Sequence, residues 1–173
     1  MGATVNSSVG VRITVTDKEI REALTRLAEK DGGLVRVALK NIGQALLKST
    51  RARFDSETAP DGSHWKPLNP EYKQGKRGLK ILQGAGVAGG LLGSINARVT
   101  GNRLEIGTNK VYAAIHQFGG VIVPKRYPAL VFRIGGKLAF ARKVTIPARP
   151  FLGVSAGDRK MALEVAGRIA TLK

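Results

Sequence analysis

The sequence predicts an α+β fold in which an antiparallel sheet of hairpins packs against a long helix and a C-terminal helix. Two pairs of short apolar segments flank tight turns at Gly101-Asn102 and Gly135-Gly136, which is typical of β-hairpins. Apolar residues recur at helical spacing over residues 34–54 and again near the C-terminus. Because the strands come in hairpins and do not alternate with helices, the pattern favours α+β over a parallel α/β sheet.

The first third of the chain is expected to form one strand and two helices. Val9–Val15 alternates β-branched residues with others, which predicts a half-buried strand. The sequence Thr16-Asp17-Lys18-Glu19 fits a capping box, so a helix is expected to begin there and to end at Asp31-Gly32-Gly33. A longer helix is then expected over about Leu34–Phe54.

Residues 55–78 are expected to form a long loop, because three prolines and three glycines interrupt them. Loops of this length are usually functional or disordered. The sole tryptophan, Trp65, lies here, which indicates that the loop docks on another surface. The following residues 79–93 are apolar but broken by glycines, and a short helix is expected around Val87–Leu92.

The second half of the chain should contain two hairpins separated by a short helix. The expected strands are Ser94–Val99 with Arg103–Gly107, then Leu130–Ile134 with Lys137–Ala141, and Val144–Ile146 continuing the second sheet.

Lys110–Phe118 predicts the short helix between the hairpins. Its apolar stripe of Tyr112, Ile115 and Phe118 is expected in the core, with His116 directed away from it. After Pro147 and Pro150 break the sheet, a final helix is expected over about Gly157–Leu172. The chain is therefore expected to be one domain, 1–173, with extended arms at 55–78 and 121–144.

Composition excludes several kinds of chemistry. The chain has no cysteine, which rules out disulfides and thiolate metal sites, and its two histidines rule out a His-rich metal centre. No apolar run is long enough to cross a membrane, and the first ten residues have no charged or apolar region of the kind found in secretion signals. No membrane association and no cofactor are therefore expected.

The net charge of +17 predicts an acidic partner, either nucleic acid or the negative surface of another protein. The stretch from Ile106 to Gly157 contains no acidic residue. Its basic residues are Lys110, Lys125, Arg126, Arg133, Lys137, Arg142, Lys143 and Arg149.

Two sequence patterns resemble a cofactor-binding motif and a catalytic motif, but the residues around them do not fit either motif. Gly84–Gly89 matches a dinucleotide-binding fingerprint with Glu105 as the ribose ligand, but too little helix follows it and Glu105 lies within an expected strand. Ser63 and His64, with Asp61 nearby, are sequence neighbours on a turn, a placement that seldom forms a catalytic triad. We therefore expect no enzymatic activity.

Three blocks of residues carry a more specific signal. They are Arg53-Phe54-Asp55 with Pro60–Leu68, Ile106–Thr108 with Tyr112–Gly120, and Ile146–Gly153, which contains Pro-Ala-Arg-Pro-Phe. In this order they resemble the phage virion morphogenesis family, the tail-completion proteins of Mu-like and related long-tailed phages. A looser fourth block spans Leu82–Ile95, and the resemblance covers about residues 15–170.

The resemblance implies a non-catalytic structural protein that forms a ring, expected to have six copies, at the head–tail junction of the virion. Its expected partners are other copies of itself, neck proteins, tail-tube or tail-terminator proteins, and DNA in the channel. It would act in the virion, after assembly in the host cytoplasm. A basic nucleic-acid-binding accessory protein of phage origin is the alternative.

Six side chains are expected to contribute to contacts between subunits. Trp65 is the tryptophan of the long loop, and Arg149 is held in a rigid Pro-rich segment that suits a subunit contact or a structural salt bridge equally well. The full set of candidates is Trp65, His116, Arg126, Arg133, Arg149 and Phe151.

Overall fold

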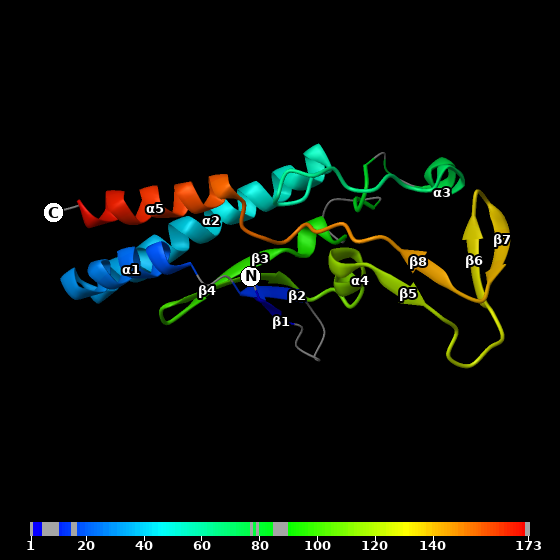
Figure 1. Ribbon diagram of the computed structural model, residues 1–173, viewed down its shortest axis with the longest axis horizontal. Helices are drawn as coiled ribbons and strands as arrows, with labels where there is room; N and C mark the ends of the chain where they lie inside the picture. Colours follow the sequence, from blue (N-terminus) through cyan, green and yellow to red (C-terminus); the bar gives the residue numbers. More distant parts are fainter. Residues whose placement is uncertain are drawn as a thin grey trace.

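The computed structural model describes residues 2–4, 11–14, 17–76, 78, 80–84 and 90–171. Three helices and a four-stranded sheet form one end of the molecule (Figure 1). The helices α1 (Lys18–Lys30), α2 (Gly32–Ser56) and α5 (Ala156–Ala170) pack against one another. In the sheet, β1 (Gly2–Thr4), β2 (Val11–Thr14), β3 (Asn96–Thr100) and β4 (Arg103–Thr108) run antiparallel in the order β1-β2-β4-β3. We call these helices and this sheet the body, and the expected α+β fold is confirmed.

A single residue, Asp31, both ends α1 and begins α2. Its backbone N–H donates to the Leu27 carbonyl at 3.1 Å, and its side chain accepts from the Gly33 N–H at 2.7 Å. Two glycines that were expected to separate the helices are thus the first turn of α2. At the start of α1 the N-cap is Asp17, whose carboxylate accepts from Ile20 N at 3.1 Å, because aspartate caps as well as threonine. Thr16 lies outside the described residues.

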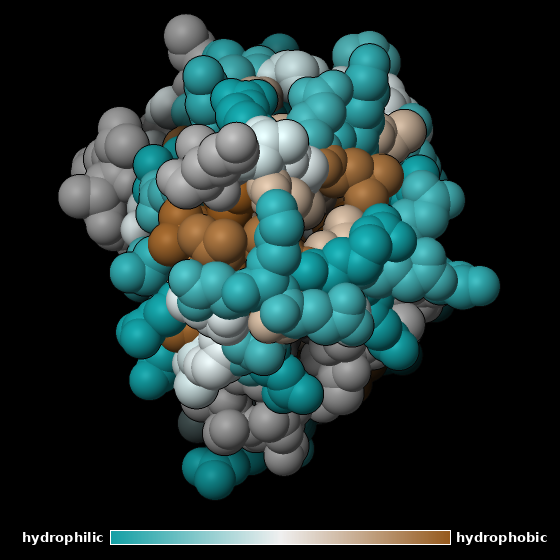
Figure 2. Space-filling model, turned by 90° about the vertical axis from the view of Figure 1, so that its left-hand side faces the viewer, coloured by the Kyte–Doolittle hydropathy of each residue, from teal (hydrophilic) through white to brown (hydrophobic). Residues whose placement is uncertain are grey.

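The long helix lies close against the β3–β4 hairpin. A Cβ atom on Gly43 would come within 2.9 Å of a Leu104 methyl group and 3.4 Å of the Ala97 Cβ. On either side of this point, buried apolar side chains of α2 cluster with side chains of α5, and Leu104 packs against both clusters. Figure 2 looks onto the end formed by these helices, where hydrophobic side chains reach the surface between polar ones.

The last helix begins with a capping box that was not predicted. Ser155 Oγ accepts from the Asp158 N–H at 3.0 Å, and Asp158 Oδ2 accepts from the Ser155 N–H at 2.9 Å. Half of the short helix expected at Val87–Leu92, residues 87–89, lies outside the described residues. The described part ends in a 3-10 turn at Leu92–Ser94.

Residues 55–78 are more structured than expected. The helix α2 continues to Ser56, a turn closed by the Thr58–His64 bridge follows, and α3 (Pro70–Gly75) ends the segment. The turn holds two buried side chains, Ala59 and Trp65.

Beyond the body, a short helix and four short strands extend to the far end of the molecule (Figure 1). The helix α4 (Ala113–Phe118) leads into β5 (Gly120–Ile122), which pairs with β8 (Val144–Ile146). Between them, β6 (Leu130–Ile134) and β7 (Lys137–Ala141) form the expected Gly135-Gly136 hairpin, next to α3. We call residues 120–146 the arm.

The expected buried stripe of α4 is wrong. Tyr112 and Phe118 are 41% and 43% exposed, and the buried residues are Ala113 and Gln117. The opposite face of the helix is buried because the Gln117 amide bonds to the backbone of residues 151 and 152.

Candidate functional site: an anchored segment and an exposed arm

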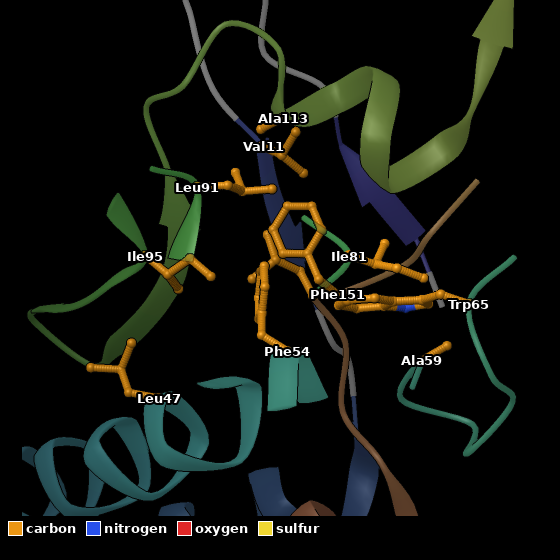
Figure 3. Close-up of a cluster of buried hydrophobic side chains, with 11 residues drawn as sticks. Val11, Leu47, Phe54, Ala59, Trp65, Ile81, Leu91, Ile95, Ala113 and Phe151 are labelled. Atoms are coloured by element: carbon orange, nitrogen blue, oxygen red, sulfur yellow. The ribbon is translucent and has the colours of Figure 1, made fainter. Parts of the chain in front are cut away.

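Residues 147–153, which we call the anchor segment, connect the arm back to the body. Their principal apolar contact is a cluster of three aromatic rings (Figure 3). Phe54 of α2 meets Trp65 edge-on with ring centroids 5.4 Å apart, and meets Phe151 at 5.6 Å with a 55° tilt. These geometries are favourable for aromatic pairs. The other buried members are Val11, Leu47, Ala59, Ile81, Leu91, Ile95, Ala113 and Leu152.

The Gln117 side chain attaches α4 to this segment. Its Oε1 accepts from the Phe151 and Leu152 N–H groups at 3.1 and 3.0 Å, and its Nε2 donates to the Leu152 carbonyl at 2.9 Å. The amide is 5% exposed, so these bonds satisfy backbone groups that water cannot reach.

Arg149 and Trp65 attach the anchor segment to the turn that precedes α3. Arg149 donates from Nε to the Lys66 carbonyl at 2.8 Å and from Nη2 to the Pro67 carbonyl at 3.1 Å. In the other direction, Trp65 Nε1 donates to the Pro150 carbonyl at 2.8 Å. Arg149 is 5% exposed, and burial lowers its pKa against the attraction of Glu57. Within the chain, Arg149 makes its structural contacts with carbonyl groups and not through a salt bridge.

A buried ion pair lies where the anchor segment meets α5. Arg53 pairs with Asp158, and their side chains are 7% and 5% exposed. Arg53 also donates to the carbonyls of Phe151 and Gly153 at 3.3 and 2.9 Å. Burial acts to raise the pKa of Asp158. Hydrogen bonds from Ser49 and Ser155 and the charge of Arg53 outweigh burial and hold this pKa below its ordinary value.

His116 is half-buried beside the same segment. Its backbone carbonyl accepts from the Arg149 N–H at 2.7 Å, and its ring lies edge-on to Tyr112 with centroids 6.0 Å apart. The ring Nδ1 is buried and has no hydrogen-bond partner among the residues that the structure describes. Burial, together with the positive charge of Arg149, lowers the pKa of His116. Both effects favour the neutral imidazole over the charged one.

The structure separates the six interface candidates into two groups. Trp65, Arg149 and Phe151 are at most 5% exposed, and His116 is half-buried, so these four make contacts within the chain. Arg126 and Arg133 are exposed on the arm. The role of all six in subunit contacts stays a prediction.

Arg53 and Gln117 stand in the blocks that resemble the family, but sequence reasoning assigned no contact to either or to Asp158, although each makes contacts that hold the anchor segment. One signal was present, because Ser155 and Asp158 have the three-residue spacing of a capping box. No local pattern indicates the Gln117 contacts, whose partners are 34 and 35 residues away.

The arm differs from the body in the character of its surface. Most of its large apolar side chains are open to solvent, and its charged side chains are all basic. The exposed apolar residues of the arm are Val121, Ile122, Val123, Tyr127, Val131, Phe132, Leu138 and Phe140. Apolar patches of this kind mark interaction sites.

The described residues show no site for a metal ion built from three or more His, Asp or Glu side chains. Among the helices that the structure describes, none is both long and apolar enough to cross a membrane.

A body held together internally that carries an arm of exposed apolar and basic side chains is typical of proteins that contact other macromolecules. The comparison with known families agrees with this class. Residues 15–170 match the phage virion morphogenesis family, and the chain belongs to it.

Curated relatives come from Mu and Mu-like prophages. Over 149 residues the chain is 32% identical to the Mu-like prophage FluMu G protein 2 of Haemophilus influenzae, covering 85% of this chain and 86% of the relative. Over 169 residues it is 27% identical to the putative capsid assembly protein G of Escherichia phage Mu, covering 94% and 96%. No solved structure matches the chain significantly. The protein is thus a phage virion morphogenesis protein that acts in virion assembly.

Proposed function

We propose that the protein is a structural subunit that forms a ring at the head–tail junction of a long-tailed phage, completing the tail and enabling it to join the head. Membership of the virion morphogenesis family over residues 15–170 is the observation that carries this proposal. The exposed arm supports it, because a junction protein needs surface for neighbours on more than one side. We propose a closed ring of six copies, made by head-to-tail contacts.

In this proposal the protein performs no catalysis and needs no cofactor. The buried charges have structural roles: Arg53 and Asp158 hold the anchor segment on α5, and Arg149 holds it on the turn before α3. The neighbours of the ring are neck proteins on one side and tail-tube or tail-terminator proteins on the other, around a channel that DNA crosses.

Electron microscopy of particles made with and without the gene tests the proposal. Full heads beside separate, unjoined tails are expected in the deletion, and a copy supplied in trans should restore joined particles. Normal joined particles in the deletion would refute the junction role. Overlong tails in the deletion would instead indicate that the protein terminates tail length.

Nucleic-acid binding is the second candidate function, favoured by the net charge of +17 and by the absence of acidic residues between Ile106 and Gly157. It predicts that the isolated chain binds duplex DNA, with affinity falling roughly 10³-fold or more between 50 and 200 mM salt if about six phosphates are contacted. Binding that is weak at low salt would rule it out.

A further inference from the structure

The β6–β7 hairpin has one face that the rest of the chain leaves open. Val131 pairs with Phe140, and Arg133 pairs with Leu138. Cross-strand partners and alternate residues share a face of a sheet, so these four side chains lie together. Val131, Leu138 and Phe140 are 57%, 55% and 70% exposed. We call these four residues the free hairpin face.

The other face of the hairpin is better covered. Its residues Leu130, Ile134, Ala139 and Ala141 are half-buried, whereas Phe132, 36% exposed, and Lys137 are exposed. The helix α3 packs beside β6, and a Cβ atom on Gly75 would come within 3.6 Å of the Gly135 Cα. A two-stranded hairpin alone is only marginally stable, so the contact with α3 supports this hairpin. The free hairpin face remains exposed to solvent.

The composition of this face indicates a protein partner. Three large apolar side chains surround one arginine, and aromatic residues and arginine are enriched in the residues that dominate protein interfaces. Duplex DNA would satisfy the arginine but would leave the apolar side chains without a matching surface, because protein–DNA interfaces are mainly polar and charged. An arginine that becomes buried in an interface needs a carboxylate beside it.

A second copy of this chain is poorly suited to supply that carboxylate. The chain has 29 basic and 12 acidic residues, so a second copy has few carboxylates to offer to Arg133. Most of its acidic side chains are also engaged within the chain. Those with a contact in the structure are Asp17, Glu19, Glu22, Asp31, Asp55, Glu57, Asp61, Glu105 and Asp158.

We propose that the free hairpin face docks into an apolar groove of a different virion protein, one with an acidic rim and a carboxylate that receives Arg133. This inference rests on the proposed virion role. It adds the residues of the contact and the chemistry of the partner. The basic residues elsewhere on the arm, such as Arg142 and Lys143, would meet the acidic rim.

Photo-crosslinking in assembled particles tests the inference. Phe140 is replaced by benzoylphenylalanine in protein produced during phage growth, purified particles are irradiated, and the products are identified by mass spectrometry. The expected product joins this chain to another virion protein, next to acidic residues of that protein. Crosslinks to a second copy or to DNA, or no crosslink at all, would overturn the inference.

Charge reversal adds an independent check. In particles that carry the photo-reactive residue, Arg133→Glu should lower the crosslink yield about 30-fold, the effect of losing a dominant interface side chain. Arg98→Glu makes the same charge change on an exposed residue of β3 in the body and should leave the yield unchanged. Equal yields for both variants would refute a carboxylate partner for Arg133. Thermal melting of the isolated variants checks that both are folded.

The two proposals can fail separately. If the protein is absent from joined particles by immunoblot, the proposed junction role fails. If it is present but crosslinks through Phe140 to itself or to DNA, the junction role stands and only the inference about the hairpin partner fails.

Discussion

Replacing Asp158 by asparagine should destabilise the protein strongly, because it removes the negative half of a buried ion pair. The asparagine would keep the size of the side chain and could still accept from the Ser155 N–H, so the helix cap is largely preserved. Arg53, whose side chain is 7% exposed, would keep its positive charge without a counter-charge. Breaking a buried pair in this way typically costs about 3–5 kcal/mol.

The remaining contacts of Arg53 place the expected loss at the lower end of that range. The guanidinium still donates to the Phe151 and Gly153 carbonyls and to Ser49 Oγ, at 3.3, 2.9 and 3.2 Å. We therefore expect Asp158→Asn to lower the free energy of unfolding by about 3 kcal/mol. For a chain of this size that corresponds to a fall in Tm of roughly 6–12 °C.

Urea denaturation at neutral pH measures the loss, with an unchanged m-value showing that the comparison is valid. Asp55→Asn is the matched control, because its pair with Lys80 at 3.3 Å is solvent-exposed and should contribute at most about 1 kcal/mol. In an Arg53→Met background, Asp158→Asn should cost much less. A loss no larger than that of the control, or equal losses in both backgrounds, would refute the reasoning.

Three further changes test other parts of the structure. Gln117→Leu leaves the Phe151 and Leu152 backbone groups buried without partners and should cost about 3 kcal/mol or more in urea denaturation; a loss under about 1 kcal/mol would contradict the assigned contacts. Gly43→Val forces side-chain atoms against Leu104 and should lower the free energy of unfolding by about 1–3 kcal/mol, seen as a lower Tm. An unchanged Tm would show that α2 and the sheet do not pack closely at this point. The third change concerns pH. Since the pKa of His116 is lowered on folding, the unfolded chain binds the extra proton more readily, and the free energy of unfolding should fall as pH drops below about 6.5. His116→Gln should remove that part of the slope between pH 7.5 and 5.5, and an unchanged slope would disprove the assignment.

The elements that the sequence predicted correctly are those defined by local chemistry. The hairpin at Gly135-Gly136 and the long helix α2 follow from turn residues and from apolar spacing over many turns. In α4, by contrast, six residues make less than two turns, and the apolar stripe of Tyr112 and Phe118 resembled a buried face. The direction in which so short a helix faces depends on Gln117 and its distant partners, which apolar spacing does not reveal.

The candidate site was predictable in outline but not in its contacts. The single tryptophan in a loop rich in proline indicated docking, and Trp65 is indeed buried against Phe54. The acceptor of its indole N–H is the Pro150 carbonyl, 85 residues further along the chain. Long-range pairs of this kind involve backbone groups, which every sequence supplies alike, so the pattern of side chains does not identify them.

The blocks that resemble the family and the surface that would recognise a partner are separate sets of residues. Trp65, Gln117 and Arg149 belong to the blocks, and all three bond to backbone groups, as Arg53 does in addition to its ion pair. Such bonds depend little on the identity of the side chains around them. The free hairpin face lies outside the blocks, and its residues make few contacts with the body. Because the free hairpin face makes few contacts with the body, substitutions on it should test the proposed partner contact without unfolding the body.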